Sequence, residues 1–251
     1  MCTLAIYFQA SEEFPLIVAA NRDEFYDRPS AAPTTVSRSP WVVAGRDLVA
    51  GGTWLGVNAH GLAAGILNRR SDRRPDPSLL SRGALCMDAL RLPAVDEAVG
   101  SICTHSASDY NPFNLLVASP SAAVLVGNLS GTMRQTTLSP GLHVLTNLDL
   151  DDMECPRIAK SFGMFESTLR HVRCGDLEGV LADLRTILSD HSTPLDPRTQ
   201  GPPNNLCVHL DHFGTRSSTI VAYSKRAGAF RMWHADGPPC RTAFDEILLP
   251  G

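Results

Sequence analysis

The order of the predicted elements indicates an α+β protein with largely antiparallel sheets. Segments with alternating apolar residues, which are typical of strands, lie toward both ends of the chain, and helical patterns lie between them. Two pairs of strands read as hairpins: residues 2–8 with 15–20, and residues 51–57 with 61–67 around the turn signal at 58–61. The chain has 251 residues, of which 43% are hydrophobic. This length can bury one large core, so we expect a single domain over residues 1–251.

The remaining elements follow from local patterns. A Pro-rich loop separates the first hairpin from a short strand at 41–44, and the basic segment 69–81 reads as an exposed loop. Ser81 is a suitable N-cap for a helix over 81–90, and a second helix is expected over 95–105. A third helix, over 176–190, carries its apolar residues at i, i+3, i+4 and i+7, which predicts a buried stripe. Further strands are expected at 113–118, 122–126, 142–146, 207–210, 218–223 and 229–234.

Composition excludes several functional classes. A net charge of -4 and a pI near 6.0 provide no general attraction to nucleic acid or to anionic membranes. No apolar stretch approaches a membrane span and no signal peptide precedes the first strand, so we expect a cytoplasmic protein without stable membrane insertion. The seven cysteines and eight histidines lack the spacings of a disulfide framework or a metal site. We therefore expect no metal and no cofactor.

Cys2 stands directly behind the initiator methionine, at the head of the first strand. If the methionine is removed, one residue carries both a thiol and a free α-amine, which is a nucleophile together with its base. With a pKa of about 7.7 to 8.0, roughly a third of such amines are neutral at pH 7.5, against about 0.1% of lysine amines. The alternative is that Cys2 is a small buried residue that opens an ordinary strand.

A polar cluster, Asn21-Arg22-Asp23-Glu24, follows the second strand of the first hairpin. In an antiparallel hairpin the end of the second strand lies beside the start of the first, so these side chains are expected within a few ångströms of Cys2. Asn21 and Asp23 also suit a turn that ends a strand. A carboxylate buried beside an arginine, however, needs a reason.

Together, Cys2 and this tetrapeptide resemble the NRDE family, also called the transport and Golgi organisation protein 2 family, within the N-terminal nucleophile hydrolase superfamily. The resemblance extends through four later strings, Gly51-Gly52-Thr53-Trp54-Leu55-Gly56-Val57-Asn58, Ser81-Arg82-Gly83, Leu145-Thr146-Asn147 and Gly214-Thr215-Arg216-Ser217-Ser218-Thr219. It covers nearly the whole chain. It implies a four-layer αββα sandwich of two largely antiparallel sheets.

A more distant similarity to bile salt hydrolases and penicillin V acylases implies catalytic roles. Asp23 would hydrogen-bond the terminal amine or the thiol, and Arg22 would lower the pKa of the thiol and orient the acyl group. Asn147, in a matching Leu-Thr-Asn turn, would donate to the oxyanion, with Asn68 as a second candidate donor. Arg216 would approach the nucleophile from across the sheet.

Other residues are candidates for contacts with the substrate. Asn21 and Glu24 would support the site, and Thr53 and Trp54 lie in the glycine-rich string, where Trp54 either packs or walls an acyl pocket. Arg82, with the basic loop before it, suits a phosphate-bearing ligand such as coenzyme A, or else is solvated. The dipeptide Cys155-Pro156 resembles a haem contact only in its two residues, and the acidic residues at 149–152 read as a solvated loop.

The sequence therefore predicts a cysteine acyl hydrolase that cleaves amides or thioesters through an acyl-Cys2 intermediate and needs no cofactor. The alternative is a non-hydrolytic carrier of haem, acyl-coenzyme A or lipid. A glutamine amidotransferase is disfavoured, because glycine normally follows the cysteine in that class and Thr3 follows it here. The acyl group, the leaving group and the oligomeric state are left open.

Overall fold

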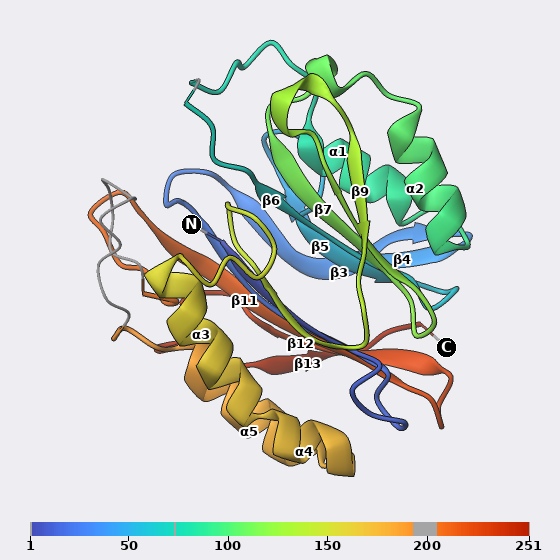
Figure 1. Cartoon of the computed structure of the whole chain (residues 1–251), viewed down its shortest axis with the longest axis vertical. Coiled ribbons are helices and arrows are strands. Elements are labelled where there is room, and N and C mark those ends of the chain that lie inside the picture. The colour runs from blue at the N-terminus through green and yellow to red at the C-terminus, as the bar shows by residue number, and fades with distance from the viewer. Residues whose placement is uncertain (1, 73, 193–204, 251) are drawn as a thin grey trace. The chain divides into compact units, whose positions relative to one another are not determined.

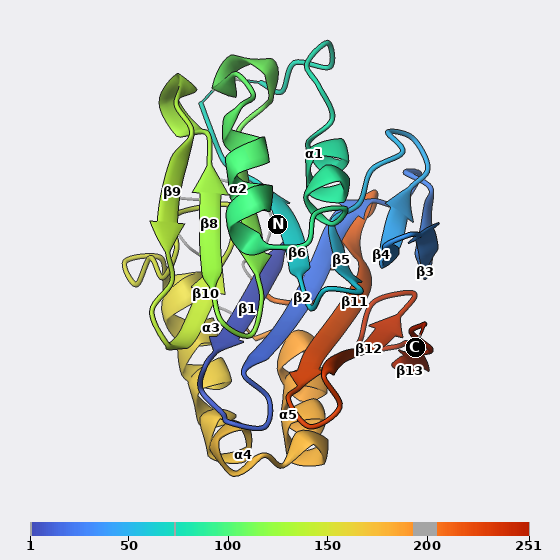
Figure 2. The same ribbon diagram turned by 90° about the vertical axis from the view of Figure 1, so that its right-hand side faces the viewer.

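The structure, a computed structural model, describes residues 2–72, 74–192 and 205–250. The chain forms two compact units, the first comprising the residues up to Asp27 and Pro140–Leu248, the second comprising Arg28–Ser139 and the end of the chain. Each unit contains one antiparallel sheet and its own helices (Figures 1 and 2), which confirms the predicted α+β class. Neither unit is continuous in sequence, and the single domain stays a prediction.

The first unit contains a six-stranded sheet in the order β10-β1-β2-β11-β12-β13. Its strands are β1 (Thr3–Phe8), β2 (Leu16–Phe25), β10 (Gly141–Leu145), β11 (Phe213–Ser224), β12 (Ala229–Ala235) and β13 (Asp245–Ile247). Every neighbouring pair is antiparallel. The predicted first hairpin is confirmed, because β1 and β2 pair from Thr3 opposite Asn21 to Phe8 opposite Leu16.

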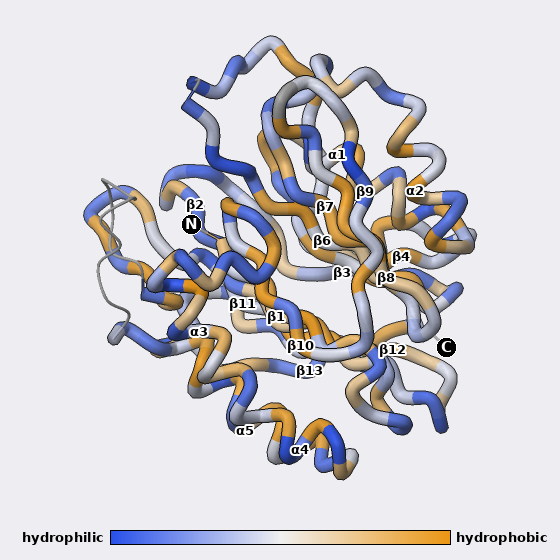
Figure 3. The backbone as a smooth tube through the Cα atoms, in the orientation of Figure 1, coloured by the Kyte–Doolittle hydropathy of each residue, from blue (hydrophilic) through white to orange (hydrophobic). Residues whose placement is uncertain are grey.

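Three helices cover one face of this sheet: α3 (Pro156–Ser167), α4 (Leu169–Cys174) and α5 (Leu177–Leu188) (Figure 1). Along them hydrophobic and hydrophilic segments alternate (Figure 3), as expected for helices with one buried side. The predicted stripe of α5 is buried against strand residues such as Ala5 and Ile17. The Tyr7 hydroxyl donates to the Phe165 carbonyl at 2.8 Å, which fastens α3 to β1.

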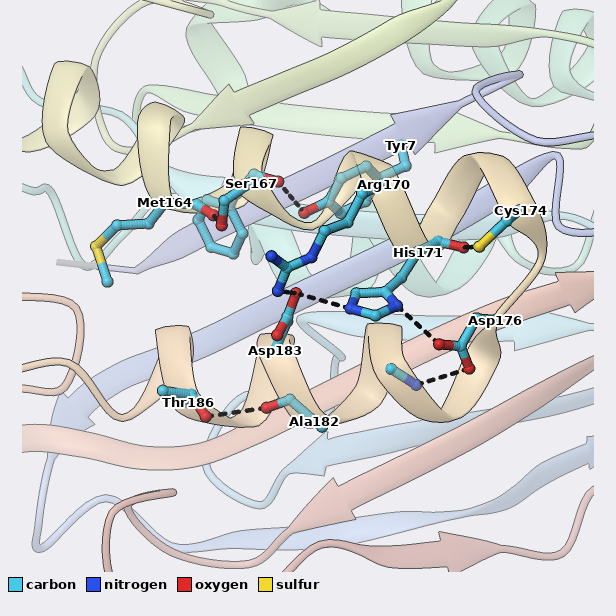
Figure 4. A network of polar contacts seen from close by, with 12 residues as sticks. Tyr7, Met164, Ser167, Arg170, His171, Cys174, Asp176, Ala182, Asp183 and Thr186 are labelled. Carbon is cyan, nitrogen blue, oxygen red and sulfur yellow. Dashed lines mark hydrogen bonds and ion pairs between the residues drawn. The ribbon is translucent and has the colours of Figure 1, made fainter.

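Ionic contacts join α4 to α5 (Figure 4). His171 lies with Nδ1 2.7 Å from Asp176 and Nε2 3.9 Å from Asp183, and Arg170 also approaches Asp183, at 3.5 Å. Asp176 caps α5 by accepting a hydrogen bond from the Gly179 N–H at 3.0 Å. The short α4 therefore holds the start of α5 in place.

The second unit contains a seven-stranded sheet in sequence order, β3 to β9. Its strands are β3 (Ser30–Arg38), β4 (Trp41–Asp47), β5 (Leu55–Asn58), β6 (Ala63–Asn68), β7 (Phe113–Ala118), β8 (Ala123–Gly127) and β9 (Arg134–Thr137). Helices α1 (Arg82–Ala89) and α2 (Val95–Cys103) pack on this sheet, and Ser81 caps α1 as predicted. Asn58 shapes the predicted β5–β6 turn, since its side-chain oxygen accepts from the N–H groups of His60 and Leu62.

The structure corrects several predicted elements. The Pro-rich segment after the first hairpin forms β3, an irregular edge strand with two register shifts, and this position is one that tolerates proline. The predicted strand at 207–210 makes only an isolated bridge between His209 and Gly214. The sequence pattern did not predict α3, α4, β9 or β13. Among the described residues, no helix is both long enough and apolar enough to cross a membrane.

Candidate active site

Cys2 lies at the end of the first unit's sheet, immediately before β1. The β1–β2 register pairs Thr3 with Asn21, and its continuation places Cys2 opposite Arg22. The Asp23 N–H donates to the Cys2 Sγ at 3.3 Å, and the Asp23 carbonyl oxygen lies 3.6 Å from the same sulfur. The structure thus brings the tetrapeptide to the cysteine, as the hairpin predicted.

The tetrapeptide lies within a strand and does not end one. Because β2 continues to Phe25, the alternative that Asn21 and Asp23 form a terminating turn is wrong. Side chains alternate along a strand, so Asn21 and Asp23 project to one face of the sheet and Arg22 to the other. The two sets therefore have different surroundings.

Asp23 is oriented by a buried hydroxyl. Its Oδ1 accepts a hydrogen bond from Thr215 at 2.7 Å, and Thr215 lies opposite Asp23 on β11. The same Thr215 oxygen accepts from the Val208 N–H at 2.9 Å, which directs the hydroxyl hydrogen toward the carboxylate. Both side chains are buried, so this geometry is set by the fold.

Asn21 connects β2 to two other segments of the first unit. Its amide nitrogen donates to the carbonyls of Leu188 and Leu206, each at 2.8 Å, and the residue is 1% exposed. These bonds tie the end of α5 and the segment at 205–209 to β2. Asn21 therefore has a structural role, and its predicted contact with a substrate stays a prediction.

Arg22 on β2 and Arg216 on β11 lie on neighbouring strands of the sheet. Arg22 is buried, with its Nη2 3.7 Å from Glu24, and its register partner on β11 is Ser217. The pairing between β2 and β11 skips Arg216, which sits in a bulge, an irregularity that re-aims side chains. The buried Arg216 Nε has no hydrogen-bond partner within the described part of the chain. The predicted approach of Arg216 to the nucleophile stays a prediction.

Asn147 follows β10, the strand on the other side of β1. Leu145, the last residue of β10, pairs with Leu4, and Asn147 lies two residues later in a bend; its predicted donation to the oxyanion stays a prediction. The turn that carries Asn147 is pinned by Asp151, whose oxygens lie 2.7 Å from the Val144 N–H and 2.7 Å from His143 Nδ1. Asp151 is thus a structural anchor, which corrects the prediction that it belongs to a solvated loop.

Burial governs the acidity of the candidate nucleophile. Desolvation raises the pKa of the Cys2 thiol, and the Asp23 carboxylate raises this pKa further. Arg22 lowers the pKa of the thiol, as predicted, but with the weakest of the contributions. The net shift is upward, so Cys2 rests as a thiol and needs a base in order to attack.

Sequence reasoning missed Arg157, which is 1% exposed beneath the site. Its Nη2 donates to the Thr3 hydroxyl at 2.8 Å, and the negative charge of Asp23 acts on it. Burial lowers the pKa of Arg157, and the charge of Asp23 opposes this shift. One signal was available. Pro156 opens α3, which puts Arg157 in the first turn, where a cation opposes the helix dipole.

The other candidates belong to the second unit, where fold contacts account for several of them. Thr53 exchanges hydrogen bonds with the backbone of Leu55. Trp54 packs over Gly45, where a Cβ atom would collide with its ring. Arg82 donates to the Pro112 carbonyl at 3.0 Å. Asn68 is exposed at the end of β6. Their predicted contacts with substrate or oxyanion stay predictions.

In the first unit, Cys155 is buried before α3 and no longer suggests a haem contact.

The chain is similar to known proteins over most of its length. The family model for Transport and Golgi organisation 2 matches residues 1–233. The Transport and Golgi organization protein 2 homolog of Bos taurus is 29% identical over an alignment of 254 positions that covers 88% of this chain and 88% of its own.

Solved structures share the fold. A penicillin V acylase from Agrobacterium tumefaciens superposes with a TM-score of 0.59 and 17% identity, covering 96% of this chain and 93% of its own. A Caenorhabditis elegans ortholog of N-acylethanolamine-hydrolyzing acid amidase superposes with a TM-score of 0.56 and 15% identity, over 88% and 92% of the two chains. These structures show the N-terminal nucleophile hydrolase fold. The match of the family model over nearly the whole chain shows more: this protein is a member of the Transport and Golgi organisation 2 family.

Proposed function

We propose that this protein is an acyl hydrolase that cleaves an amide or thioester through an acyl-Cys2 intermediate after removal of Met1. One observation carries the proposal: the Cys2 sulfur lies 3.3 Å from the Asp23 N–H, and a buried Thr215 hydroxyl aims the Asp23 carboxylate. A thiol held by the backbone of a residue whose carboxylate is oriented, at the start of a chain, is an arrangement suited to covalent catalysis. An ordinary strand-opening cysteine has no need of it.

The reaction is an attack of Cys2 Sγ on the carbonyl carbon of the substrate. The thiol proton passes to the Cys2 α-amine, and the negative charge moves to the carbonyl oxygen, where the Asn147 amide donates a hydrogen bond. Collapse of this intermediate breaks the C–N or C–S bond, and the amine returns its proton to the leaving group. Water then attacks the acyl-Cys2 thioester, which releases a carboxylic acid and restores the thiol.

The electrostatics of the site suit this proton transfer. Because burial and the charge of Asp23 raise the pKa of Cys2, the resting site holds a neutral thiol. Once the amine has taken the proton, the Asp23 carboxylate stabilises the ammonium group. Asp23 thereby opposes a resting thiolate and favours the protonated amine that forms during the attack.

The fold adds support for the class of substrate. The two solved neighbours are named as an acylase and as an N-acylethanolamine-hydrolyzing amidase. The second name describes hydrolysis of an N-acyl compound, so N-acyl amides are the first substrates to test, followed by acyl thioesters.

A second candidate is a non-hydrolytic carrier of haem, acyl-coenzyme A or lipid. It is favoured by the names of the curated relatives, which describe transport and not hydrolysis. A carrier does not need the sulfur of Cys2, so it should tolerate Cys2→Ser. A nucleophile enzyme should lose most of its turnover.

The test is the intact mass of the purified protein before and after exposure to N-acyl amides and acyl thioesters. We expect loss of the methionine mass and an acyl adduct on Cys2, with adduct formation unchanged in Cys174→Ala, an exposed cysteine on α4. Asp23→Asn and Asn147→Ala should each slow acylation at least about tenfold. The exposed Asp211→Asn, in the same unit, is the control for Asp23→Asn.

Two results would count against hydrolysis. Retention of Met1 on the active protein would remove the proposed base. Turnover by Cys2→Ser at the wild-type rate would show that the sulfur is not the nucleophile and would favour the carrier.

A further inference from the structure

Four potential metal ligands lie close together in the first unit, although they come from separate segments of the sequence. They are His191, Cys207, His209 and Cys240, and one ligand atom from each lies within 4.8 Å of all the others. His191 follows α5, Cys207 and His209 lie in the segment at 205–209, and Cys240 lies in the loop after β12. Three separate parts of the chain therefore meet at one point.

The distances match a tetrahedral centre. The sulfurs of Cys207 and Cys240 are 3.6 Å apart, and His209 Nε2 lies 3.6 Å from the first and 3.2 Å from the second. Zinc bound at about 2.3 Å from sulfur and about 2.1 Å from nitrogen separates two sulfurs by about 3.8 Å, and sulfur from nitrogen by about 3.6 Å. The three donors therefore already stand close to their bound positions.

The fourth donor is oriented by a hydrogen bond. His191 Nδ1 lies 2.9 Å from the Cys207 carbonyl oxygen, and donation from this nitrogen leaves the lone pair on Nε2. Histidines that bind metals commonly use their second nitrogen in this way, because the bond fixes the tautomer and the ring orientation. The Cys207 carbonyl thus serves as an outer partner for a ligand of the same site.

We propose that this cluster binds one zinc ion through the two thiolates and two imidazoles. Two sulfurs with two nitrogens in a tetrahedral arrangement favour zinc over magnesium or calcium, which prefer oxygen. With four protein ligands the site is closed, as in structural zinc sites, and leaves no position for a substrate. This proposal departs from the expectation of no metal. That expectation came from spacing: His191 and Cys207 are 16 positions apart, and His209 and Cys240 are 31 positions apart.

The ion would support the end of the sheet that carries the candidate active site. Between the two ligands of the 205–209 segment, the Val208 N–H donates to the Thr215 hydroxyl, which in turn donates to Asp23. The neighbouring Leu206 carbonyl accepts from Asn21 on β2. Zinc would hold this segment to the end of α5 and to the loop after β12, and so keep Thr215 in position.

The experiment measures metal directly, using the full chain without a histidine tag, purified under reducing conditions. We expect about one zinc per chain by elemental analysis, and cobalt in its place should give the visible absorption of a tetrahedral thiolate complex. Cys240→Ser should weaken zinc affinity at least about 100-fold, measured by competition with a chromogenic chelator. Cys174→Ser, an exposed cysteine on α4, should bind zinc as tightly as the wild type.

Three results would overturn the proposal. One is reduced protein that neither contains zinc nor takes up zinc or cobalt. Another is equal zinc affinity in Cys240→Ser and Cys174→Ser. The third is a disulfide between Cys207 and Cys240 that forms even under reducing conditions and excludes metal. Cys240 lies near the surface, so its substitution leaves the core intact. Because the readout is bound metal, the result does not depend on whether the protein hydrolyses a substrate.

Discussion

Buried His234 should make the stability of this protein depend on pH. The residue lies on β12, is 4% exposed, and shares a 2.9 Å hydrogen bond between its Nδ1 and the hydroxyl of Thr219. Burial lowers the pKa of His234 from 6.5 to about 4. The pKa of His234 is lower in the folded chain than in the unfolded chain. At a pH between these two values, His234 therefore binds a proton in the unfolded chain but not in the folded chain. The free energy of unfolding must therefore fall as the pH falls from about 7 toward 4.

The size of the effect follows from the two pKa values. At pH 5.5 the linkage costs about 1.4 kcal/mol and at pH 7.5 less than about 0.1 kcal/mol, so acidification between them removes about 1.3 kcal/mol. Below pH 4 the loss levels off near about 3.4 kcal/mol, because a shift of about 2.5 units corresponds to that energy. A loss of this size shifts a urea midpoint measurably.

Urea unfolding at pH 7.5 and pH 5.5 tests this reasoning in three proteins. His234→Gln should lose about 1.3 kcal/mol less than the wild type on acidification, whatever its stability at pH 7.5. The control is His212→Gln, an exposed histidine of the same unit, which should keep the wild-type difference. An unchanged difference in His234→Gln would show that this histidine titrates normally in the folded protein.

Two further substitutions test the packing. Arg157→Met should lower the free energy of unfolding in urea by about 3 to 5 kcal/mol, because it leaves Asp23 without a buried countercharge. Adding Asp23→Asn should recover part of that loss. No recovery would show that Arg157 does not stabilise the Asp23 carboxylate. Gly52→Ala should cost about 1 to 3 kcal/mol because its Cβ atom would meet the Gly83 backbone, whereas Gly100→Ala, with open space around a helical glycine, should stabilise by up to about 1 kcal/mol. Thermal unfolding of both glycine variants checks the contrast, and equal shifts would contradict it.

Sequence reasoning succeeded where the signal is local. The first hairpin follows from alternation and a short turn, the turn at 58–61 from its Asn-Ala-His-Gly signal, and α5 from its apolar period. It failed at β3, where proline suggested a loop although an edge strand tolerates it. It also failed at α3, whose start at Pro156 was available as a signal.

The same division applies to the candidate site. The neighbourhood of Cys2 and Asp23 was predictable because one hairpin makes it. Arg157 comes from 154 residues beyond its partner Thr3, and the four clustered histidines and cysteines come from three segments. Contacts of that kind depend on how the helices and the last strands return to the sheet. The spacing of residues in the sequence therefore could not predict these contacts.

Because side chains alternate along β2, the register of this strand decides which residues face each side of the sheet. Asn21 and Asp23 point toward the framework contacts at Leu206 and Thr215, and Arg22 projects to the opposite face with Cys2. A single-residue deletion between positions 16 and 20 would shift every later side chain to the other face, so Arg22 would take the place of Asn21 and Asp23 the place of Arg22. Deletions of one residue there should be far more damaging than any single substitution, whereas the turn at 9–15 should tolerate a change in length.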